Sequence, residues 1–249
     1  MTGLADRVVV VTGGASGIGE ATALGLVEAG ARVAVLDRDA DRVRALGERL
    51  GAAAFGQVVD VASDAEVARA MTAIREALGP IAGLVTSAGI FDPSELAPAG
   101  DVSVAAFERV LRVNLLGTFL AVHHALPHLV ETCGAIVTIA STAGLRGHGY
   151  GAGYTASKGG VVALTRLLAV QYGPRGVRAN CLCPGFVATP MNAGVHDDPQ
   201  AVARIAKGIP LGRIATAGEI ASVACHLLGD DTSYVNGQVL AVDGGATVL

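Results

Sequence analysis

The sequence is short of charged residues and has no charged tail, and these shortages exclude whole classes of protein. Only 16% of the 249 residues are charged while 51% are hydrophobic, a balance that excludes an intrinsically disordered chain. The net charge is −4 at pH 7, and no block of basic residues interrupts the chain. Binding to nucleic acid or to an anionic membrane surface is therefore not expected.

Cysteine is also scarce, and its spacing excludes the common metal and redox motifs. The chain has four cysteines, and no two of them stand in a C-x-x-C pattern. Cys181 and Cys183 are separated by a single residue, which is neither zinc-ligand nor redox spacing. We expect reduced cysteines, mostly in the core, and no metal site.

Long hydrophobic runs are missing as well. No uninterrupted apolar segment approaches the roughly 18 residues of a membrane span, because Arg112 and Asn114 interrupt the most hydrophobic region. The first seven residues lack the apolar stretch of a signal peptide, so a cytoplasmic protein is expected. A chain of 249 residues suits one α/β domain with a large core.

What the sequence does contain is a regular alternation of β-branched runs and segments of helical spacing. This alternation predicts an α/β fold: a single doubly wound Rossmann-type domain over residues 1–249, with a parallel sheet of about seven strands and helices on both faces. Ligands of such sheets bind at the carboxyl ends of the strands. The clearest predicted strands are 8–11, 32–37, 135–140, 176–183 and 238–242, and the clearest predicted helices are 39–50, 65–78, 104–130, 154–172 and 217–228.

A glycine-rich turn follows the first strand and precedes a helix. In that arrangement, backbone N–H groups and a helix N-terminus can bind a pyrophosphate. The glycines would allow close backbone approach, although a purely structural tight turn is the alternative. The spacing G-x-x-x-G-x-G also differs from the common G-x-G-x-x-G fingerprint. The predicted cofactor contacts in this turn are Gly13, Ser16, Gly17, Ile18 and Gly19.

The second strand ends in an acid, Asp37, which lies 18 residues after Gly19. A carboxylate at this distance is expected to bind the adenosine ribose hydroxyls and to repel a 2′-phosphate, which favours NAD over NADP. Arg38 leaves NADP as the alternative, because a guanidinium can pair with that phosphate. Asp60 ends its strand at the same edge and could accept a hydrogen bond from adenine; a turn-forming aspartate is the other interpretation.

The stretch from Ser141 to Lys158 contains the candidate catalytic residues. Tyr154 and Lys158 are four residues apart, so a helix places them on one face. A neighbouring ammonium lowers the tyrosine pKa from its usual ~10, and the phenol can then act as an acid or base near neutral pH. With four tyrosines and two lysines in the chain, this spacing is expected by chance only about 0.03 times.

These residues together resemble the short-chain dehydrogenase/reductase family over nearly the whole chain. Thr12-Gly13-x-x-x-Gly17-Ile18-Gly19 matches the family's cofactor motif, and Asp60-Val61 matches its adenine-contacting pair. Its catalytic tetrad corresponds to Asn114, Ser141, Tyr154 and Lys158. The loop on the nicotinamide side corresponds to Pro184, Gly185, Val187, Thr189 and Met191. The family's Asn-Asn-Ala-Gly turn reads Thr86-Ser87-Ala88-Gly89 here, a departure that puts the contacts of that turn in doubt.

The resemblance implies a role for each of these positions. Tyr154 would be the acid/base, Ser141 would position the carbonyl, and Lys158 would lower the tyrosine pKa and hold the nicotinamide ribose. Asn114 would order a proton-relay water; a buried structural asparagine is the alternative. The family also implies a homotetramer or homodimer that packs through helices 104–130 and 155–172 and through the C-terminal segment.

The sequence therefore predicts an NAD-dependent oxidoreductase acting on a secondary alcohol or ketone. An NADP-dependent 3-oxoacyl-carrier-protein or carbonyl reductase is one alternative, and a non-catalytic dinucleotide-sensing protein is another. Residues 186–210, which contain three prolines, are predicted to be a loop that acts as a substrate lid. Loop 142–153 is expected to form the other wall of the substrate pocket. Its Arg146 and His148 could meet an anionic or hydroxylated substrate, but the interpretation as solvent-facing loop residues is favoured.

Overall fold

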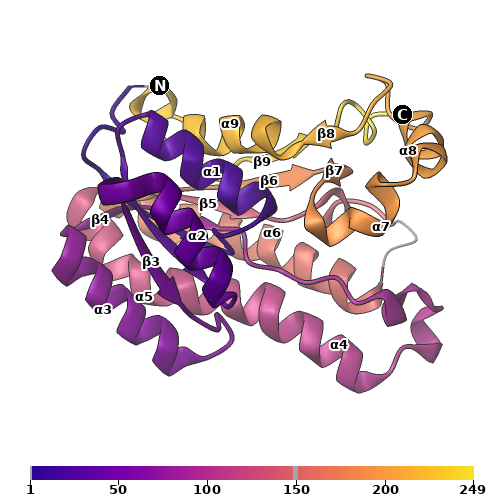
Figure 1. The fold of residues 1–249 in the computed structure, drawn as a ribbon, viewed down its shortest axis with the longest axis horizontal. Helices are drawn as coiled ribbons and strands as arrows, with labels where there is room; N and C mark the ends of the chain where they lie inside the picture. The colour runs from indigo at the N-terminus through magenta and orange to yellow at the C-terminus, as the bar shows by residue number, and fades with distance from the viewer. Residues whose placement is uncertain (1, 148–150) are drawn as a thin grey trace.

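A seven-stranded parallel sheet runs through the centre of the protein (Figure 1). The computed structural model describes residues 2–147 and 151–249. The strand order is β3-β2-β1-β4-β5-β6-β9, so the order reverses between β1 and β4. The strands are β1 (Val8–Thr12), β2 (Arg32–Asp37), β3 (Ala54–Val58), β4 (Ile81–Thr86), β5 (Ala135–Ile139), β6 (Arg178–Pro184) and β9 (Val239–Val242).

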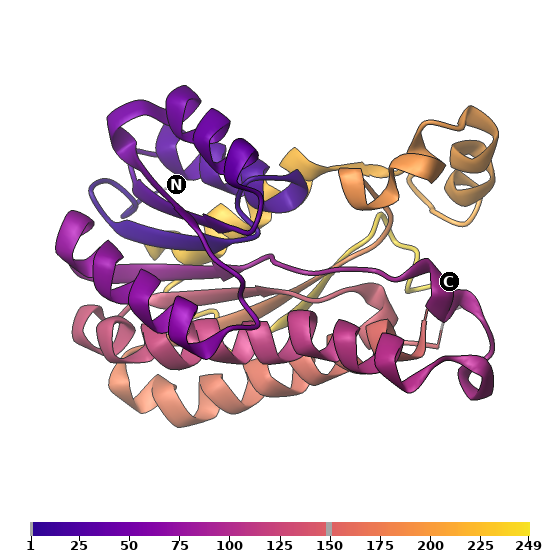
Figure 2. The same ribbon diagram turned by 60° about the horizontal axis from the view of Figure 1, so that its bottom comes forward.

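Helices cover both faces of this sheet (Figure 2). One face packs against α1 (Gly17–Glu28), α2 (Ala40–Leu50) and α9 (Ala217–Leu228). The other packs against α3 (Asp64–Leu78), α5 (Gly117–Thr132) and α6 (Ala152–Tyr172), and α4 (Val104–Leu111) packs on α6. The predicted doubly wound Rossmann-type fold is confirmed.

The apolar strand β1 explains how two cores form on one sheet. Its side chains alternate between the faces: Val9 and Val11 enter the core under α1 and α9, while Val8 and Val10 enter the core under α3 and α5. A strand that is buried on both sides must be apolar throughout, as parallel central strands are. The continuous valine run is therefore what places β1, and the turn after it, in the middle of the molecule.

The predicted helix 104–130 differs from the observed structure in one respect. The stretch is helical from Val104 to Thr132, but a π-helical turn, Arg112–Leu116, separates α4 from α5. By length and composition alone, Val104–Thr132 could cross a membrane, with 44% of its apolar window buried inside the fold. Its buried side chains, among them Leu120, Ala121 and Leu129, belong to the core beside the sheet.

The prediction that residues 186–210 form a loop is only partly right. This segment contains a short strand, β7 (Val187–Ala188), and two helices, α7 (Ala193–His196) and α8 (Pro199–Ala206). β7 pairs with β8 (Ala215–Thr216). Proline misled the prediction, because Pro199 occupies the first turn of α8, where its missing N–H costs nothing, and the Asp198 side chain caps that helix.

All four cysteines are free, and three of them are buried. Cys181 and Cys183 point to the same side of β6, and their Sγ atoms lie 4.0 Å apart. Cys133 is exposed and adopts a left-handed conformation (φ +50°) at the end of α5. In residues 2–147 and 151–249, no group of three or more His, Cys, Asp or Glu side chains could hold a metal ion.

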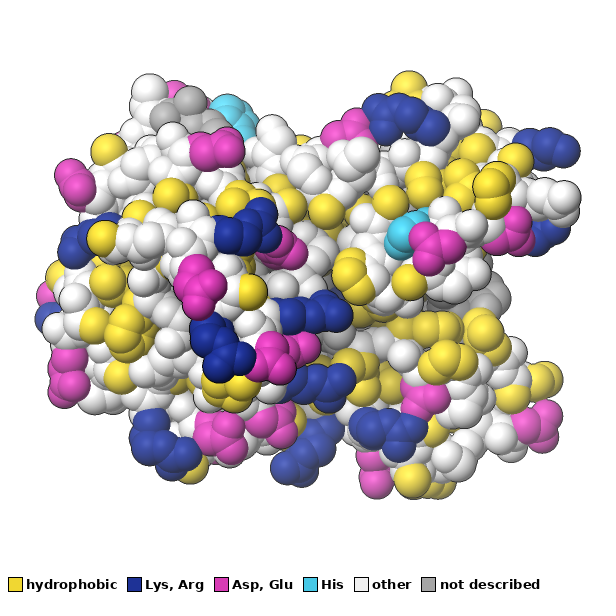
Figure 3. Space-filling view, viewed as in Figure 1, with side chains coloured by type: hydrophobic (Ala, Val, Ile, Leu, Met, Phe, Trp, Pro, Cys, Tyr) yellow, Lys and Arg dark blue, Asp and Glu magenta, His cyan; other side chains and the backbone are white. Residues whose placement is uncertain are grey.

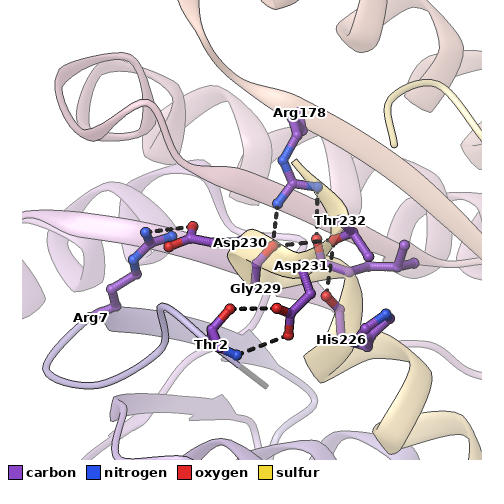
Figure 4. A network of polar contacts seen from close by, with 9 residues as sticks. Thr2, Arg7, Arg178, His226, Gly229, Asp230, Asp231 and Thr232 are labelled. Atoms are coloured by element: carbon purple, nitrogen blue, oxygen red, sulfur yellow. Dashed lines mark hydrogen bonds and ion pairs between the residues drawn. The ribbon is translucent and has the colours of Figure 1, made fainter. Parts of the chain in front are cut away.

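A polar network connects three parts of the chain: the N-terminal segment, the end of α9 and the first residue of β6 (Figure 4). Arg178 donates hydrogen bonds to the carbonyls of Leu227 (2.9 Å) and Gly229 (3.1 Å), which end α9. Arg7 forms an ion pair with Asp230 at 2.8 Å. Because Arg178 begins β6 and Pro184 ends it, this network lies at the opposite edge of the sheet from the strands' carboxyl ends.

Candidate active site

A cleft of about 370 Å³ lies at the carboxyl ends of the parallel strands, beside the point where the strand order reverses. Figure 3 shows basic and acidic side chains gathered beside a hollow between the α2 region and α7. Of the residues that the sequence singled out, those that line the cleft are Gly13, Ser16, Gly17, Ile18, Asp37, Arg38, Asp60, Val61, Ser87, Ala88, Gly89, Ser141, Tyr154, Lys158, Pro184, Gly185, Val187, Thr189 and Met191.

The glycine turn between β1 and α1 forms one wall of the cleft. Gly13 and Gly17 have φ values of +62° and +53°, a conformation that side chains disfavour. A Cβ on Gly13 would lie 2.6 Å from the Ala88 Cα, so the turns after β1 and β4 can approach only because both residues are small. The N–H groups of the first turn of α1 have no partners within the helix, and this turn faces the cleft.

Gly19 has a different place from the one expected. It is buried and is not among the cleft-lining residues. A Cβ on Gly19 would lie 2.1 Å from the carbonyl oxygen of Gly13. Its missing side chain therefore lets α1 pack against its own preceding turn, while Gly13 and Gly17 line the cleft.

Asp37, at the end of β2, lines the end of the cleft where the sequence predicts the adenosine. Its carboxylate accepts hydrogen bonds from the N–H groups of Ala15 (3.1 Å) and Asp39 (3.2 Å). Asp37 thus orients the glycine turn and remains on the cleft wall. Arg42, which sequence reasoning missed, also lines this end and pairs with Asp39 at 3.2 Å. Its position one turn into α2 was the only local signal.

Asp60 adopts a local turn beside that end of the cleft. Its carboxylate accepts a hydrogen bond from the N–H of Ala62 (2.9 Å), and its own N–H donates to Glu66 (2.9 Å). Both interpretations of Asp60 therefore remain compatible with its position: it forms a turn, and it lines the cleft.

The atypical turn Thr86-Ser87-Ala88-Gly89 is held by backbone hydrogen bonds. The N–H of Ser87 donates to the carbonyl of Thr12 (3.1 Å), and the N–H of Ala88 donates to the Thr12 hydroxyl (3.4 Å). The Thr86 hydroxyl is buried and has no partner within the described residues. The departure from Asn-Asn-Ala-Gly thus leaves the turn anchored to β1.

Tyr154 and Lys158 lie one turn apart on α6 and both line the cleft. The Lys158 Nζ is 5.6 Å from the centroid of the tyrosine ring and donates to the Ile139 carbonyl at 2.9 Å. Burial lowers the pKa of Lys158 from 10.5 to about 8, because its ammonium loses hydration; the nearby Cys181 and Cys183 oppose this shift. The lysine is still mostly charged at neutral pH.

Ser141 lies opposite this pair at the end of β5. Its Oγ accepts a hydrogen bond from the N–H of Ala143 at 3.1 Å, which fixes the hydroxyl at the cleft wall. The loop that follows packs tightly on α6, since a Cβ on Gly144 would lie 2.7 Å from the Lys158 carbonyl carbon. β5 and α6 therefore bring Ser141, Tyr154 and Lys158 to one place.

Asn114 occupies the π-helical turn and does not line the cleft. Its side-chain amide accepts from the N–H of Ile90 (2.7 Å) and donates to the Ile90 carbonyl (3.0 Å) and to Ser157 Oγ (3.2 Å). Both of its N–H donors are thus engaged by protein. In the structure this side chain fastens the segment after β4 to α6, and a water-ordering role for Asn114 stays a prediction.

The segment after β6 closes the cleft. A Cβ on Gly17 would lie 3.4 Å from the Thr189 side chain, so Thr189 sits against the first turn of α1. Asn192, another cleft residue that the sequence did not indicate, donates from its side chain to the Val187 carbonyl at 3.1 Å. The structure thus brings the end of β6 and the start of α1 together.

Two further observations concern Arg146, His148 and Glu95. His148 lies outside the described residues, and Arg146 is not among those lining the cleft. Glu95, to which the sequence gave no role, is fully buried and accepts hydrogen bonds from the first turn of α6. No local pattern around Glu95 indicates this contact, because its partners are 58 and 59 residues away.

Known proteins resemble this chain over its full length. A family model described as enoyl-(acyl carrier protein) reductase matches residues 13–247. The 2-(S)-hydroxypropyl-CoM dehydrogenase 3 of Xanthobacter autotrophicus is 39% identical, covering 99% of this chain and 98% of that protein. The inactive 2-(S)-hydroxypropyl-CoM dehydrogenase 2 of the same organism is 42% identical, covering 90% and 98%. A crystal structure of levodione reductase matches with a TM-score of 0.92 and 38% identity, over 98% of each chain.

Proposed function

This chain belongs to the short-chain dehydrogenase/reductase family, whose members are oxidoreductases using a nicotinamide dinucleotide, and we propose that it is an NAD-dependent dehydrogenase of a secondary alcohol. One observation carries the proposal: the Tyr154–Lys158 pair and the glycine turn line the same cleft. A phenol whose proton can be moved near pH 7 then faces a place for a dinucleotide. The reverse reaction, reduction of the ketone, uses the same groups.

The residues present fit a dinucleotide. Because Gly17 has no side chain, the space between the glycine turn and Thr189 stays open for a ligand. The first turn of α1 offers N–H groups to a pyrophosphate. At the far end, the Asp37 carboxylate is held in place by two backbone N–H groups, where it would meet the adenosine ribose. A carboxylate there accepts hydrogen bonds from ribose hydroxyls and repels a 2′-phosphate, which supports NAD.

The proton chemistry belongs to α6 and to the end of β5. Tyr154, as the phenolate, removes the hydroxyl proton of the alcohol, and Ser141 donates a hydrogen bond to the same oxygen. The Lys158 ammonium favours the phenolate through its charge, at 5.6 Å from the ring centroid. A bound nicotinamide dinucleotide supplies the hydride acceptor. In this proposal Asn114 supports the site indirectly, by fixing Ile90 beside Gly89.

We further propose that residues 186–210 act as a substrate lid. Val187, Thr189 and Met191 reach the cleft from this segment. The helices α7 and α8, both described in full, have no fully buried residue. Elements with so little burial can open at low cost, which is what a lid needs.

A homotetramer or homodimer in the cytoplasm remains our prediction for the assembly. Apolar side chains are exposed on α5 and α6: Phe119 is 46% exposed, Leu167 50% and Val170 75%. Exposed apolar side chains on these two helices are compatible with the contact between protein copies that we propose. Light scattering of the purified protein would measure the mass directly, and a monomer would refute the prediction.

The decisive test of the proposed function is Tyr154→Phe, which removes only the hydroxyl. We expect turnover of secondary alcohols, followed by NADH absorbance, to fall by roughly the 10²–10⁴-fold that general acid–base catalysis contributes. NAD binding, measured by calorimetry, should stay close to normal. If the variant keeps most of its rate, the assignment of Tyr154 is wrong. A panel of diols, cyclic alcohols, sugars and 3-hydroxyacyl thioesters would identify the substrate class.

Two alternatives have specific support. Arg38 and Arg42 both line the adenosine end, where a guanidinium could bind the 2′-phosphate of NADP. A non-catalytic dinucleotide sensor is the other, and a relative described as inactive is 42% identical to this chain. Rates measured with NAD and with NADP separate the first alternative; dinucleotide binding without turnover on the whole panel would favour the second.

A further inference from the structure

Glu95 is a fully buried carboxylic acid, with 0% of its surface exposed. It lies in a 3-10 turn, Pro93–Leu96, in the segment that follows β4. Acidic side chains are almost never buried completely unless they are partnered. Its Oε1 accepts a hydrogen bond from the N–H of Gly153 at 2.9 Å, and its Oε2 accepts one from the N–H of Tyr154 at 3.0 Å.

These two N–H groups are the ones that a helix normally leaves to its cap. Gly151 precedes the first residue of α6 and has no side chain, so α6 has no cap of its own. The N–H groups two and three positions after the cap residue are those that a capping side chain satisfies. Glu95 satisfies both of them from a distant part of the chain. An acidic group at this end of a helix is also favoured by the helix dipole.

The glycines before Tyr154 are shaped to this carboxyl group. A Cβ on Gly151 would lie 2.3 Å from the Glu95 Cβ, and one on Gly153 would lie 2.2 Å from its Oε1. Contacts this short do not occur between real atoms. The need to admit Glu95 therefore accounts for both glycines, which the dinucleotide site does not explain.

The same segment reaches Tyr154 by a second route. The ring of Phe91 contacts the ring of Tyr154 edge to face, with 5.6 Å between centroids and 86° between planes. Ile90, just before it, is fixed by the Asn114 amide. Hence Glu95 holds Tyr154 at its backbone, and Phe91 holds it at its ring.

We propose that Glu95 is a positioning residue for Tyr154: its buried carboxyl group fixes the first turn of α6, and with it the direction of the tyrosine hydroxyl toward the cleft. The inference rests on the proposed function of Tyr154. Because Glu95 does not reach the dinucleotide wall, its loss should lower kcat while leaving NAD affinity intact. A shift of about 1 Å in a catalytic group can cost on the order of 100-fold in rate.

The test compares Glu95→Gln with a matched control, Asp92→Asn, from the same segment. Asp92 caps the 3-10 turn and pairs with Arg109, but it does not contact Tyr154. The glutamine keeps one acceptor and presents its NH₂ group to the other N–H, so we expect kcat to fall about 10- to 100-fold. NAD affinity should stay within about twofold, because the dinucleotide wall is unchanged. Asp92→Asn should lower thermal stability slightly and leave kcat within about twofold, since asparagine keeps the capping oxygen and loses only the ion pair with Arg109.

Two double variants show whether Glu95 acts through Tyr154. In the Tyr154→Phe background, Glu95→Gln should cause no further loss, because two residues that act as a unit are not additive. Gly153→Ala alone should reduce kcat by displacing the carboxyl group, and should have little further effect in a Glu95→Ala background.

The outcomes separate the two proposals. A Glu95→Gln enzyme with kcat within twofold of the original, a parallel loss of NAD affinity, or an additive loss with Tyr154→Phe would each overturn the positioning role. If Tyr154→Phe itself retains its rate, the proposed function fails, whatever Glu95 does.

Discussion

Replacing Lys158 with methionine should make the protein more stable and less active at the same time. Methionine has a similar volume and no charge, so the change removes the ammonium with little effect on packing. The chain has only one other lysine, Lys207, which is exposed, so Lys207→Met is a closely matched control.

The loss of activity follows from Coulomb's law. At 5.6 Å between Nζ and the ring centroid, and with an effective dielectric constant of about 20, one unit charge favours the phenolate by about 3 kcal/mol. Without this charge, the phenolate at neutral pH should be about 100-fold less populated. We expect kcat at pH 7 to fall by about that factor with Lys158→Met and to be unchanged with Lys207→Met.

The gain in stability follows from the same buried charge. The pKa of Lys158 falls from 10.5 in the unfolded chain to about 8 in the folded protein. Below pH 8 the folded protein must bury an ammonium, which costs about 3 kcal/mol. Between pH 8 and 10.5 the unfolded chain binds more protons than the folded one, so this cost declines; above pH 10.5 it is gone. The Lys158→Met variant also loses the hydrogen bond to the Ile139 carbonyl, and this loss offsets about 1–2 kcal/mol of the gain in stability.

Urea unfolding of the two variants and the original protein at pH 7 and pH 10 measures this difference. Lys158→Met should be more stable than the original by about 1–2 kcal/mol at pH 7, and this advantage should vanish or reverse by pH 10. A variant that is destabilised equally at both pH values would refute the buried-charge argument. A variant that keeps its kcat would refute the role of Lys158 in favouring the phenolate.

Two further predictions concern the ends of the sheet. Asp37→Ala should narrow the ratio of kcat/KM for NAD over NADP, because Arg38 and Arg42 remain while the carboxylate that repels a 2′-phosphate is removed; an unchanged ratio would assign the preference to another residue. Arg178→Met should lower the free energy of unfolding by about 2–4 kcal/mol, since three carbonyls lose a charged donor. It should leave kcat unchanged, because the cleft lies at the opposite edge of the sheet. Arg7→Met, which breaks only the exposed pair with Asp230, is its control and should cost less than about 1 kcal/mol; equal losses from the two variants would contradict the assignment.

Much of the fold could be predicted because its signals are local. The valine run of β1, the glycine turn and the helical spacing after Tyr154 each lie within a short stretch, and period and turn chemistry are properties of such stretches. A parallel sheet then brings the strands' carboxyl ends to one edge. Asp37, Ser141 and Pro184 could therefore be placed around one cleft without knowledge of any side-chain contact.

Other features depended on contacts between distant residues, and these only the tertiary structure decided. Glu95 reaches Tyr154 across 59 residues, and the Asn114 amide pairs with Ile90 across 24; neither partner is marked by spacing or periodicity. The glycines at 151 and 153 are visible in the sequence, but the carboxyl group that they admit is not. A short stretch of sequence fixes how its own backbone folds, whereas the neighbour of a buried side chain is set by how whole elements pack.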